Sequence, residues 1–170
     1  MLPHIRQWLI DLLYRAIGRP REPVPPWFIC YWLDNRYKVT ICKASCTLTI
    51  DYMTPRTPGT TLELPRTYPV AIGANPDGAD KREAGDQRTP EGAFRVCQKL
   101  RLSRPHGGYG PYWLRLDTRR AGWEGIGIHG TNKPYAIGTK ATAGCVRLHN
   151  DHITELYHLI PLGTLVEIVP

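Results

Sequence analysis

The sequence predicts a mainly β fold with one short helix near the C-terminus. Sixteen glycines and sixteen prolines in 170 residues indicate many turns, and turns separate short strands. Several segments alternate apolar and polar residues with the period of two that a half-buried strand shows. Residues 151–160 instead repeat apolar positions with the period of a helix. The chain is long enough for one domain with a core of its own.

Residues 1–26 are predicted to form an amphipathic helix followed by a proline-rich linker. Apolar side chains recur at helical spacing over residues 2–17, and a glycine and several prolines follow. This helix either packs on the domain or lies on a membrane surface. Asp11 and Arg15 interrupt its apolar stretch and no small-residue cleavage site follows, so it is unlike a signal peptide. No stretch approaches the roughly 20 apolar residues that a membrane-spanning helix needs.

Residues 27–170 are predicted to form the folded domain. Strands are expected where short apolar or alternating runs are bounded by turn residues: 27–33, 37–42, 46–50, 61–64, 67–72, 93–98, 112–116 and 164–169. The glycine-rich segments 73–92 and 103–111 are expected to be loops. A loop as long as the first is usually functional or mobile. The helix over 151–160 is expected to have Asn150 as its N-cap.

The net charge of +7 suits an anionic partner, but it does not point to nucleic acid. Lysines and arginines are spread along the whole chain, and no nucleic-acid-binding motif is present. An anionic cell wall or a peptide bearing carboxylates fits the charge equally well. A basic surface that serves solubility alone is the other interpretation.

The cysteine count is odd, so at least one thiol is unpaired or pairs with another molecule. The five lie at positions 30, 42, 46, 97 and 145. In an exported protein, two disulfides among the first four would leave Cys145 free, and three pairings remain open. Cys42 and Cys46 lack a second ligand pair at zinc-finger spacing, and His149 and His152 lack a third ligand. No metal site is therefore predicted.

The functional prediction depends on the segment from Gly125 to Leu148. It begins GIGIHGTN and ends TAGCVRL, so a histidine and a cysteine each sit beside glycines. A tight hairpin-like return would bring His129 and Cys145 face to face, where an imidazole can take the thiol proton and the thiolate can attack. A free thiol with a pKa of about 8.5 is only slightly ionised at neutral pH, so the base matters. The alternative is that Cys145 is a small buried hydrophobe or half of a disulfide.

Other residues near these two suit a polar site. Gly130 and Gly144 permit turns and close backbone approach. Arg147 points to the same side as Cys145 on an extended segment, where it could hold a carboxylate or form a surface ion pair. Three residues add further polar groups: Thr131, Asn132 and Thr142. Two aromatic residues either line the cleft or belong to the core: Tyr112 and Trp113.

These motifs resemble the L,D-transpeptidase catalytic domain, the YkuD family. His-Gly-Thr is followed 16 positions later by the cysteine of Thr-x-Gly-Cys-Val-Arg. Four further segments fit, in the family's order: YPVAIG (68–73), GDQRTPEG (85–92), GPYWLRL (110–116) and GTLVEI (163–168). The resemblance covers about residues 67–170. It implies a β-sandwich-like catalytic fold.

The resemblance also implies a reaction. Cys145 would attack the peptidoglycan stem tetrapeptide between the diamino acid at position 3 and D-alanine at position 4. A thioester would form, and an acceptor amine would take the acyl group to give a 3–3 cross-link. The Gly130 carbonyl would orient His129, and the N–H groups of Gly144 and Cys145 would stabilise the oxyanion, with Arg147 on a substrate carboxylate. No metal or organic cofactor is implied.

Two alternatives remain open at this stage. Water in place of the amine would make the protein an L,D-carboxypeptidase, and loss of turnover would leave a cell-wall-binding module. Ala143 stands where the family often has histidine, whereas Thr142 keeps the hydroxyl of the commoner serine. The resemblance implies a place in the cell envelope, in the periplasm or cell wall, and a role in peptidoglycan biosynthesis, cell wall organisation and cell shape. It does not predict an oligomeric state.

Overall fold

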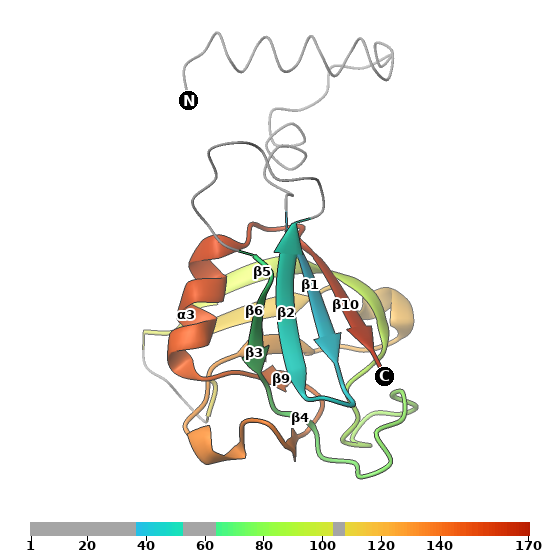
Figure 1. The fold of residues 1–170 in the computed structure, drawn as a ribbon. Coiled ribbons are helices and arrows are strands. Elements are labelled where there is room, and N and C mark those ends of the chain that lie inside the picture. Colours follow the sequence, from blue (N-terminus) through green and yellow to red (C-terminus); the bar gives the residue numbers. More distant parts are fainter. Residues whose placement is uncertain (1–36, 53–63, 104–107) are drawn as a thin grey trace, which may run out of the picture. The chain divides into compact units, whose positions relative to one another are not determined.

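Figure 1 shows the fold as a computed structural model, which describes residues 37–52, 64–103 and 108–170. Its elements are β1 (Tyr37–Cys42), β2 (Thr47–Tyr52), β3 (Arg66–Pro69), β4 (Ile72–Gly73), β5 (Gly92–Arg101), β6 (Tyr112–Leu116), β7 (Gly127–His129), β8 (Lys140–Thr142), β9 (Val146–Arg147), α3 (Asn150–Leu159) and β10 (Leu165–Val169), with short 3-10 turns η1 (Arg119–Ala121) and η2 (Pro134–Ala136). The predicted helix and linker over 1–26, the strand at 27–33 and most of the strand at 61–64 lie outside the described residues. None of the described helices has the length and apolar character needed to cross a bilayer.

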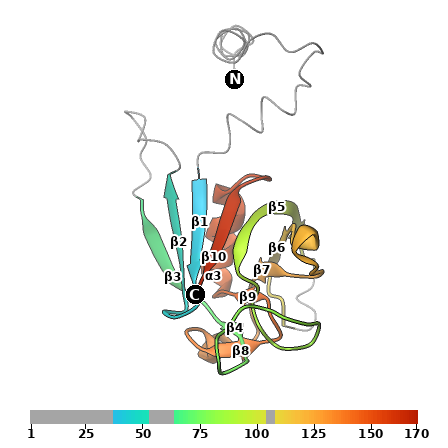
Figure 2. The same cartoon turned by 90° about the vertical axis from the view of Figure 1, so that its right-hand side faces the viewer.

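Eight of the described strands form one curled sheet, in the order β3-β2-β1-β10-β5-β6-β7-β9, and β4 pairs with β8. The first half of β5 pairs with β10, and the second half pairs with β6. A register shift between Val96 and Gln98 separates the two halves, and such bulges bend and twist a strand. Figure 2 shows the result: β1, β2, β3 and β10 form one face, and β5, β6, β7 and β9 form the other. The predicted mainly β fold is confirmed.

The core lies inside the curl and is built by alternation along the strands. Inward side chains are fully or almost fully buried in both halves of the sheet: Val39, Ile41, Leu48, Ile50, Leu114, Leu116, Ile128, Val166 and Ile168. The helix α3 packs against β6 and β7 and adds Ile153 and Leu156. Burial of these apolar side chains supplies the main favourable term for folding.

Most element predictions agree with the structure, with differences at the ends. β1 and β6 have the predicted bounds, whereas β5 extends beyond 93–98 at both ends because it spans both halves of the sheet. The segment 67–72 splits into β3 and β4. Asn150 is not the N-cap: His149 takes that place without a side-chain hydrogen bond, because the Asn150 side chain bonds elsewhere.

Candidate active site

His129 and the residue after Cys145 lie on adjacent parallel strands. In the β7–β9 pair, Ile128 is opposite Val146 and His129 is opposite Arg147. Parallel neighbours need a crossover connection, and the chain between them supplies it with η2 and β8. The predicted hairpin-like return is therefore wrong. When the pairing of β7 with β9 is extended by one residue toward the N-terminus, Cys145 nevertheless lies beside Gly127.

The strand pairing places the side chains of His129, Cys145 and Arg147 on one face of the sheet. Side chains alternate along a strand, and directly paired residues point to the same side of a sheet. Ile128 and Val146 are completely buried in the core. His129, Cys145 and Arg147 therefore share the opposite face, which is the outer face of this half of the sheet.

His129 is held in one tautomer by its neighbours. Its side chain is buried, and Nδ1 donates a hydrogen bond to the Gly130 carbonyl oxygen at 2.7 Å. The Trp113 ring stacks on the imidazole almost in parallel, at 5.0 Å between centroids and 3° between planes. Tyr109 meets it edge-on at 5.0 Å. Because Nδ1 carries the proton, Nε2 is the nitrogen that can accept one.

Burial lowers the pKa of His129 from 6.5 to about 4. The hydrogen bond with Gly130 opposes this shift, and the charge of Arg147 adds to it. Desolvation disfavours the charged form of an imidazole. His129 is therefore neutral at physiological pH, as a proton acceptor must be.

The thiol of Cys145 is half-buried and protonated at rest. It donates to the Gly125 carbonyl oxygen at 3.4 Å. Burial raises its pKa, while the Gly127 N–H and the charges of Arg147 and Lys81 act in the opposite direction. A neutral thiol and a neutral imidazole therefore share this face at rest.

The turn that carries Cys145 is fastened by Thr142. The Gly144 N–H donates to Thr142 Oγ1 at 3.1 Å, and that hydroxyl donates to the Cys145 carbonyl at 2.6 Å. Gly144 has φ +137°, and a Cβ there would lie 2.9 Å from the carbonyl oxygen of Arg88. Thr142 is buried within this turn, so the structure places it beneath the thiol and not in an open pocket.

Asn150 supports the other side of the site, a role that was not predicted although the family-like run CVRLHN (145–150) ends at this residue. Its Oδ1 accepts the N–H of Thr131 at 2.8 Å. A Cβ on either Gly110 or Gly130 would lie 2.4 Å from that same oxygen. Asn150 therefore fixes the chain directly after the His129–Gly130 hydrogen bond, and the two glycines allow the close packing.

A pocket of about 510 Å³ opens over the thiol. Its lining is largely aromatic and apolar, with one lysine and one glutamate: Lys81, Ala84, Gly85, Tyr109, Trp113, Gly122, Trp123, Glu124, Gly125, Ile126, Ala143 and Cys145. Among the predicted site residues, only Trp113 and Cys145 line it. Lys81, Tyr109 and Trp123 were not predicted, because no local motif links them to the cysteine.

Three predicted residues lie elsewhere. Tyr112 faces α3, where it stacks on Tyr157 at 4.2 Å, because successive strand residues point to opposite faces. Thr131 is buried and accepts the Lys133 N–H at 2.8 Å. Asn132 is exposed. The structure does not bring these three side chains to the thiol pocket.

The long loop between β4 and β5 is ordered by buried charges. Lys81 Nζ lies 2.6 Å from Asp86 Oδ1, and their side chains are 7% and 2% exposed. The same ammonium lies 5.3 Å from the centre of the Trp123 ring, a cation–π distance. The ion pair therefore links the loop to the wall of the thiol pocket.

Four described cysteines are free thiols: Cys42, Cys46, Cys97 and Cys145. Cys30 lies outside the described residues, so the proposed partition into two disulfides is not seen in the part that the structure covers. Within that part, no three potential metal ligands gather.

The pKa of His129 gives a prediction for the pH dependence of thiol acylation. The rate should fall with an apparent pKa near 4, and not near 6.5, because only the neutral imidazole accepts the proton. Initial rates of adduct formation across pH 3.5–8 measure this.

The free energy of unfolding should also rise with pH between about 4 and 6.5, where the unfolded chain binds more protons. His129→Gln should reduce that rise, and an inflection of the acylation rate at pH 6.5 in the wild-type protein would contradict the burial argument.

Comparison with known proteins agrees with this architecture. The sequence model of the L,D-transpeptidase catalytic domain, YkuD, matches residues 58–168. The putative L,D-transpeptidase YkuD of Bacillus licheniformis is 37% identical over 107 residues, which cover 63% of this chain and 54% of that protein. The protein of the same name from Bacillus subtilis is 37% identical over 103 residues, covering 61% and 52%. The chain thus spans about half the length of these curated relatives.

Solved structures share the fold at lower identity. An L,D-transpeptidase from Mycobacterium smegmatis aligns with a TM-score of 0.56 and 19% identity, over 79% of this chain and 59% of that one. Bd1075 of Bdellovibrio bacteriovorus aligns with a TM-score of 0.60 and 22% identity, over 81% and 49%. With the family match covering most of the described domain, the chain belongs to the YkuD family of L,D-transpeptidase catalytic domains.

Proposed function

We propose that this chain is a peptidoglycan L,D-transpeptidase that uses Cys145 as its nucleophile. The observation that carries the proposal is the hydrogen bond from His129 Nδ1 to the Gly130 carbonyl at 2.7 Å. It leaves Nε2 as proton acceptor on the face that holds Cys145. A carbonyl oxygen can orient an imidazole as a carboxylate does in other triads.

The first step is acylation. Cys145 attacks the carbonyl carbon between the diamino acid and D-alanine of a stem tetrapeptide, and His129 Nε2 takes the thiol proton. The carbon–nitrogen bond breaks, a thioester forms, and D-alanine leaves with the proton from His129. The N–H of Gly127, which already faces the sulfur, stabilises negative charge there.

The oxyanion would be stabilised by the backbone N–H groups of Gly144 and Cys145. The Gly144 N–H donates to Thr142 Oγ1 at rest, so it must exchange that partner for the oxyanion. One donor of this kind contributes on the order of 3 kcal/mol to the transition state. Thr142 then acts by holding the turn in which both N–H groups lie.

Arg147 is proposed to bind a carboxylate of the substrate. It shares the outer face with Cys145, and its Nε is buried with no hydrogen-bond partner among the described residues. A buried donor without a partner is costly, and a substrate carboxylate would satisfy it with a charge-assisted bond. Because the chain belongs to a family of L,D-transpeptidase catalytic domains, we place the protein at the peptidoglycan of the cell envelope.

Mass spectrometry of the protein incubated with a purified disaccharide-tetrapeptide tests the proposal. An acyl adduct on Cys145 with release of D-alanine is expected. Cys97→Ser, which removes an exposed thiol, should keep the adduct, and Cys145→Ala should lose it. Cross-linked dimer among the products supports the transpeptidase, whereas tripeptide alone would make the protein an L,D-carboxypeptidase. Binding with neither adduct nor release would leave a cell-wall-binding module.

A further inference from the structure

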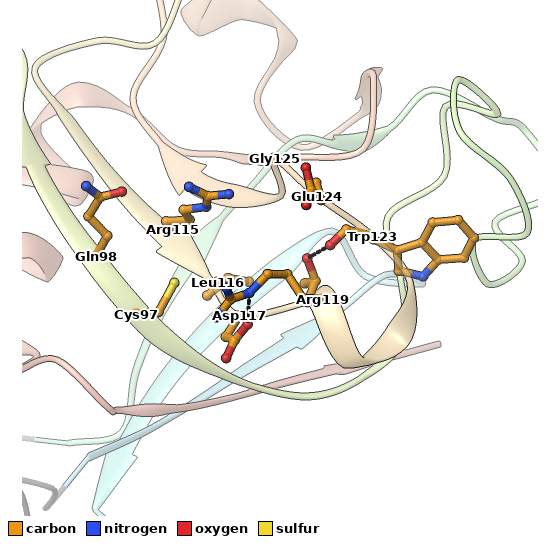
Figure 3. Close-up of a pocket in the computed structure, with 10 residues that line it drawn as sticks. Cys97, Gln98, Arg115, Leu116, Asp117, Arg119, Trp123, Glu124 and Gly125 are labelled. Carbon is orange, nitrogen blue, oxygen red and sulfur yellow. Dashed lines mark hydrogen bonds and ion pairs between the residues drawn. The ribbon is translucent and has the colours of Figure 1, made fainter.

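A second pocket, of about 290 Å³, lies next to the thiol pocket (Figure 3). It is lined mostly by polar and charged side chains from β5, β6 and the connection that follows β6: Cys97, Gln98, Arg115, Leu116, Asp117, Thr118, Arg119, Trp123, Glu124 and Gly125. The last three residues also line the thiol pocket. The two pockets therefore share one wall, and the Gly125 carbonyl in that wall accepts the Cys145 thiol at 3.4 Å.

The sheet register places Arg115 in line with the thiol. Arg115 on β6 pairs with Gly127 on β7, and Gly127 lies beside Cys145. Neighbouring strands are about 4.8 Å apart, so the backbones of Arg115 and Cys145 are about 10 Å apart across two strands. Arg115 points to the same side as Trp113, two residues earlier. No side chain on Gly127 stands between them.

Two of the charges in the second pocket are left without an ion-pair partner. Arg119 pairs with Asp117 at 3.0 Å. Neither Arg115 nor Glu124 forms an ion pair with any described residue. Figure 3 shows the Arg115 guanidinium extended toward the side of the pocket where Glu124 lies. The pocket thus offers one free cation and one free anion close together.

The wall between the pockets is fixed in place. Thr118 is buried, and its Oγ1 donates to the Trp123 carbonyl at 2.7 Å. On the other side Trp123 lies under the ammonium of Lys81. Glu124 therefore follows a residue, Trp123, that is held by Thr118 of the second pocket and by Lys81 of the thiol pocket.

We propose that the second pocket is the acceptor subsite, which binds an amino-acid headgroup with a free amine and a neighbouring carboxylate. Arg115 binds the carboxylate and Glu124 binds the ammonium. This inference rests on the proposed function, because it assigns the second substrate of that reaction. The second pocket has a volume of about 290 Å³, near the lower end of the range for ligand pockets, about 300 Å³. This volume suits a headgroup and not a whole stem peptide.

The transfer step balances with groups already named. The bound ammonium loses one proton to water, and its nitrogen attacks the thioester carbonyl carbon. One carbon–nitrogen bond forms and the carbon–sulfur bond breaks. The second proton passes from that nitrogen to His129 Nε2 and then to Cys145 Sγ, which restores the neutral thiol and neutral imidazole of the resting enzyme.

Arg115→Gln and Glu124→Gln, compared with Arg101→Gln, test the subsite during turnover. Arg101 is an exposed arginine on β5 outside both pockets. Arg115 lines only the second pocket, so Arg115→Gln should form the acyl adduct at a rate within about threefold of the wild type. The ratio of cross-linked dimer to tripeptide should fall at least tenfold in both pocket variants. Arg101→Gln should change neither. An unchanged ratio in both pocket variants would overturn the acceptor subsite and leave the acylation chemistry intact.

A binding experiment separates this inference from the proposed chemistry. Cys145→Ala protein is titrated with the stem tripeptide ending in diaminopimelate, and binding is followed by nuclear magnetic resonance. Arg115→Gln should weaken binding of the free acid about tenfold and leave binding of its carboxamide unchanged. Glu124→Gln should discriminate in the same way between the free amine and its acetylated form. Equal affinities of both variants for all three probes, the tripeptide, its carboxamide and its acetylated form, would contradict the subsite, whether or not the wild type forms an adduct.

Discussion

Asp86→Ala is expected to lower the free energy of unfolding by about 3 kcal/mol, the low end for breaking a buried ion pair. The carboxylate accepts hydrogen bonds from Lys81 Nζ at 2.6 Å and from the backbone N–H groups of Arg82 at 2.8 Å and Arg88 at 3.0 Å. Its removal leaves the Lys81 ammonium, 7% exposed, without its anion. The low end applies because the loop lies at the molecular surface, where water can reach part of the Lys81 ammonium once the carboxylate has been removed.

The same carboxylate sets a pH dependence. Burial acts to raise the pKa of Asp86, but the hydrogen bonds from Lys81 and the backbone outweigh it and hold the pKa well below its usual range. A carboxyl with a depressed folded pKa contributes stability above its unfolded pKa of about 3.9, and that contribution is lost as pH falls below this value. The Asp86→Ala variant should therefore lose less stability than the wild type between pH 5 and pH 2.

Thermal unfolding followed by circular dichroism measures both effects. A loss of this size corresponds to a drop of roughly 6–12 °C in Tm for a chain of this length. Asp151→Ala, an exposed aspartate in the first turn of α3, serves as the control and should change Tm by no more than about 2 °C. A Tm for Asp86→Ala equal to that of the control would show that the loop does not depend on the ion pair.

Gly127→Ala is expected to reduce the rate of D-alanine release at least 100-fold while the protein remains folded. A Cβ at this position would lie 2.7 Å from Trp113 Cε2 and 2.8 Å from the Leu114 carbonyl oxygen. The indole must move, and it is stacked on the His129 imidazole. A displacement of about 1 Å in a catalytic group can cost about 100-fold in rate.

The matched control is Gly138→Ala. A Cβ on Gly138 would meet no atom within 4 Å, but φ there is +88°. An alanine in this left-handed region costs about 1–2 kcal/mol of stability without touching the site. D-alanine release should therefore stay near the wild-type rate in Gly138→Ala. Near-ultraviolet circular dichroism should report the moved indole in Gly127→Ala only. Wild-type turnover in Gly127→Ala would show that the stacking does not position His129.

The sequence predicted the elements whose burial follows a local period. Residues 37–42 and 112–116 alternate cleanly, and they became β1 and β6. The pairing of β7 with β9 could not be predicted in this way, because a period does not state which distant strand lies alongside. Tyr112 and Trp113 show the same limit: two adjacent aromatics suit either face, and only the sheet register decides between them.

The least predictable part of the site was the loop over 73–92. It has no apolar period, because its order comes from buried charges and not from an apolar face. Lys81 therefore looked like an ordinary surface residue in the sequence, and the family-like segment 85–92 contains Asp86 without indicating that the two residues pair. Asn150 was assigned to a helix end by its residue type, although its oxygen supports the chain after His129. In each case the deciding contact joins residues that are distant in the chain or lack a recognisable pattern.

The position of β10 has a consequence for biosynthesis. This strand lies in the middle of the sheet, between β1 and β5, although it is the last described strand to be synthesised. Within the eight-stranded sheet, β1, β2 and β3 pair with no strand of the other half until residues 165–169 are available. Pairing of such distant segments is slow. The eight-stranded sheet can therefore be completed only after β10 has been synthesised, because β10 joins the half made of β1, β2 and β3 to the half that holds His129.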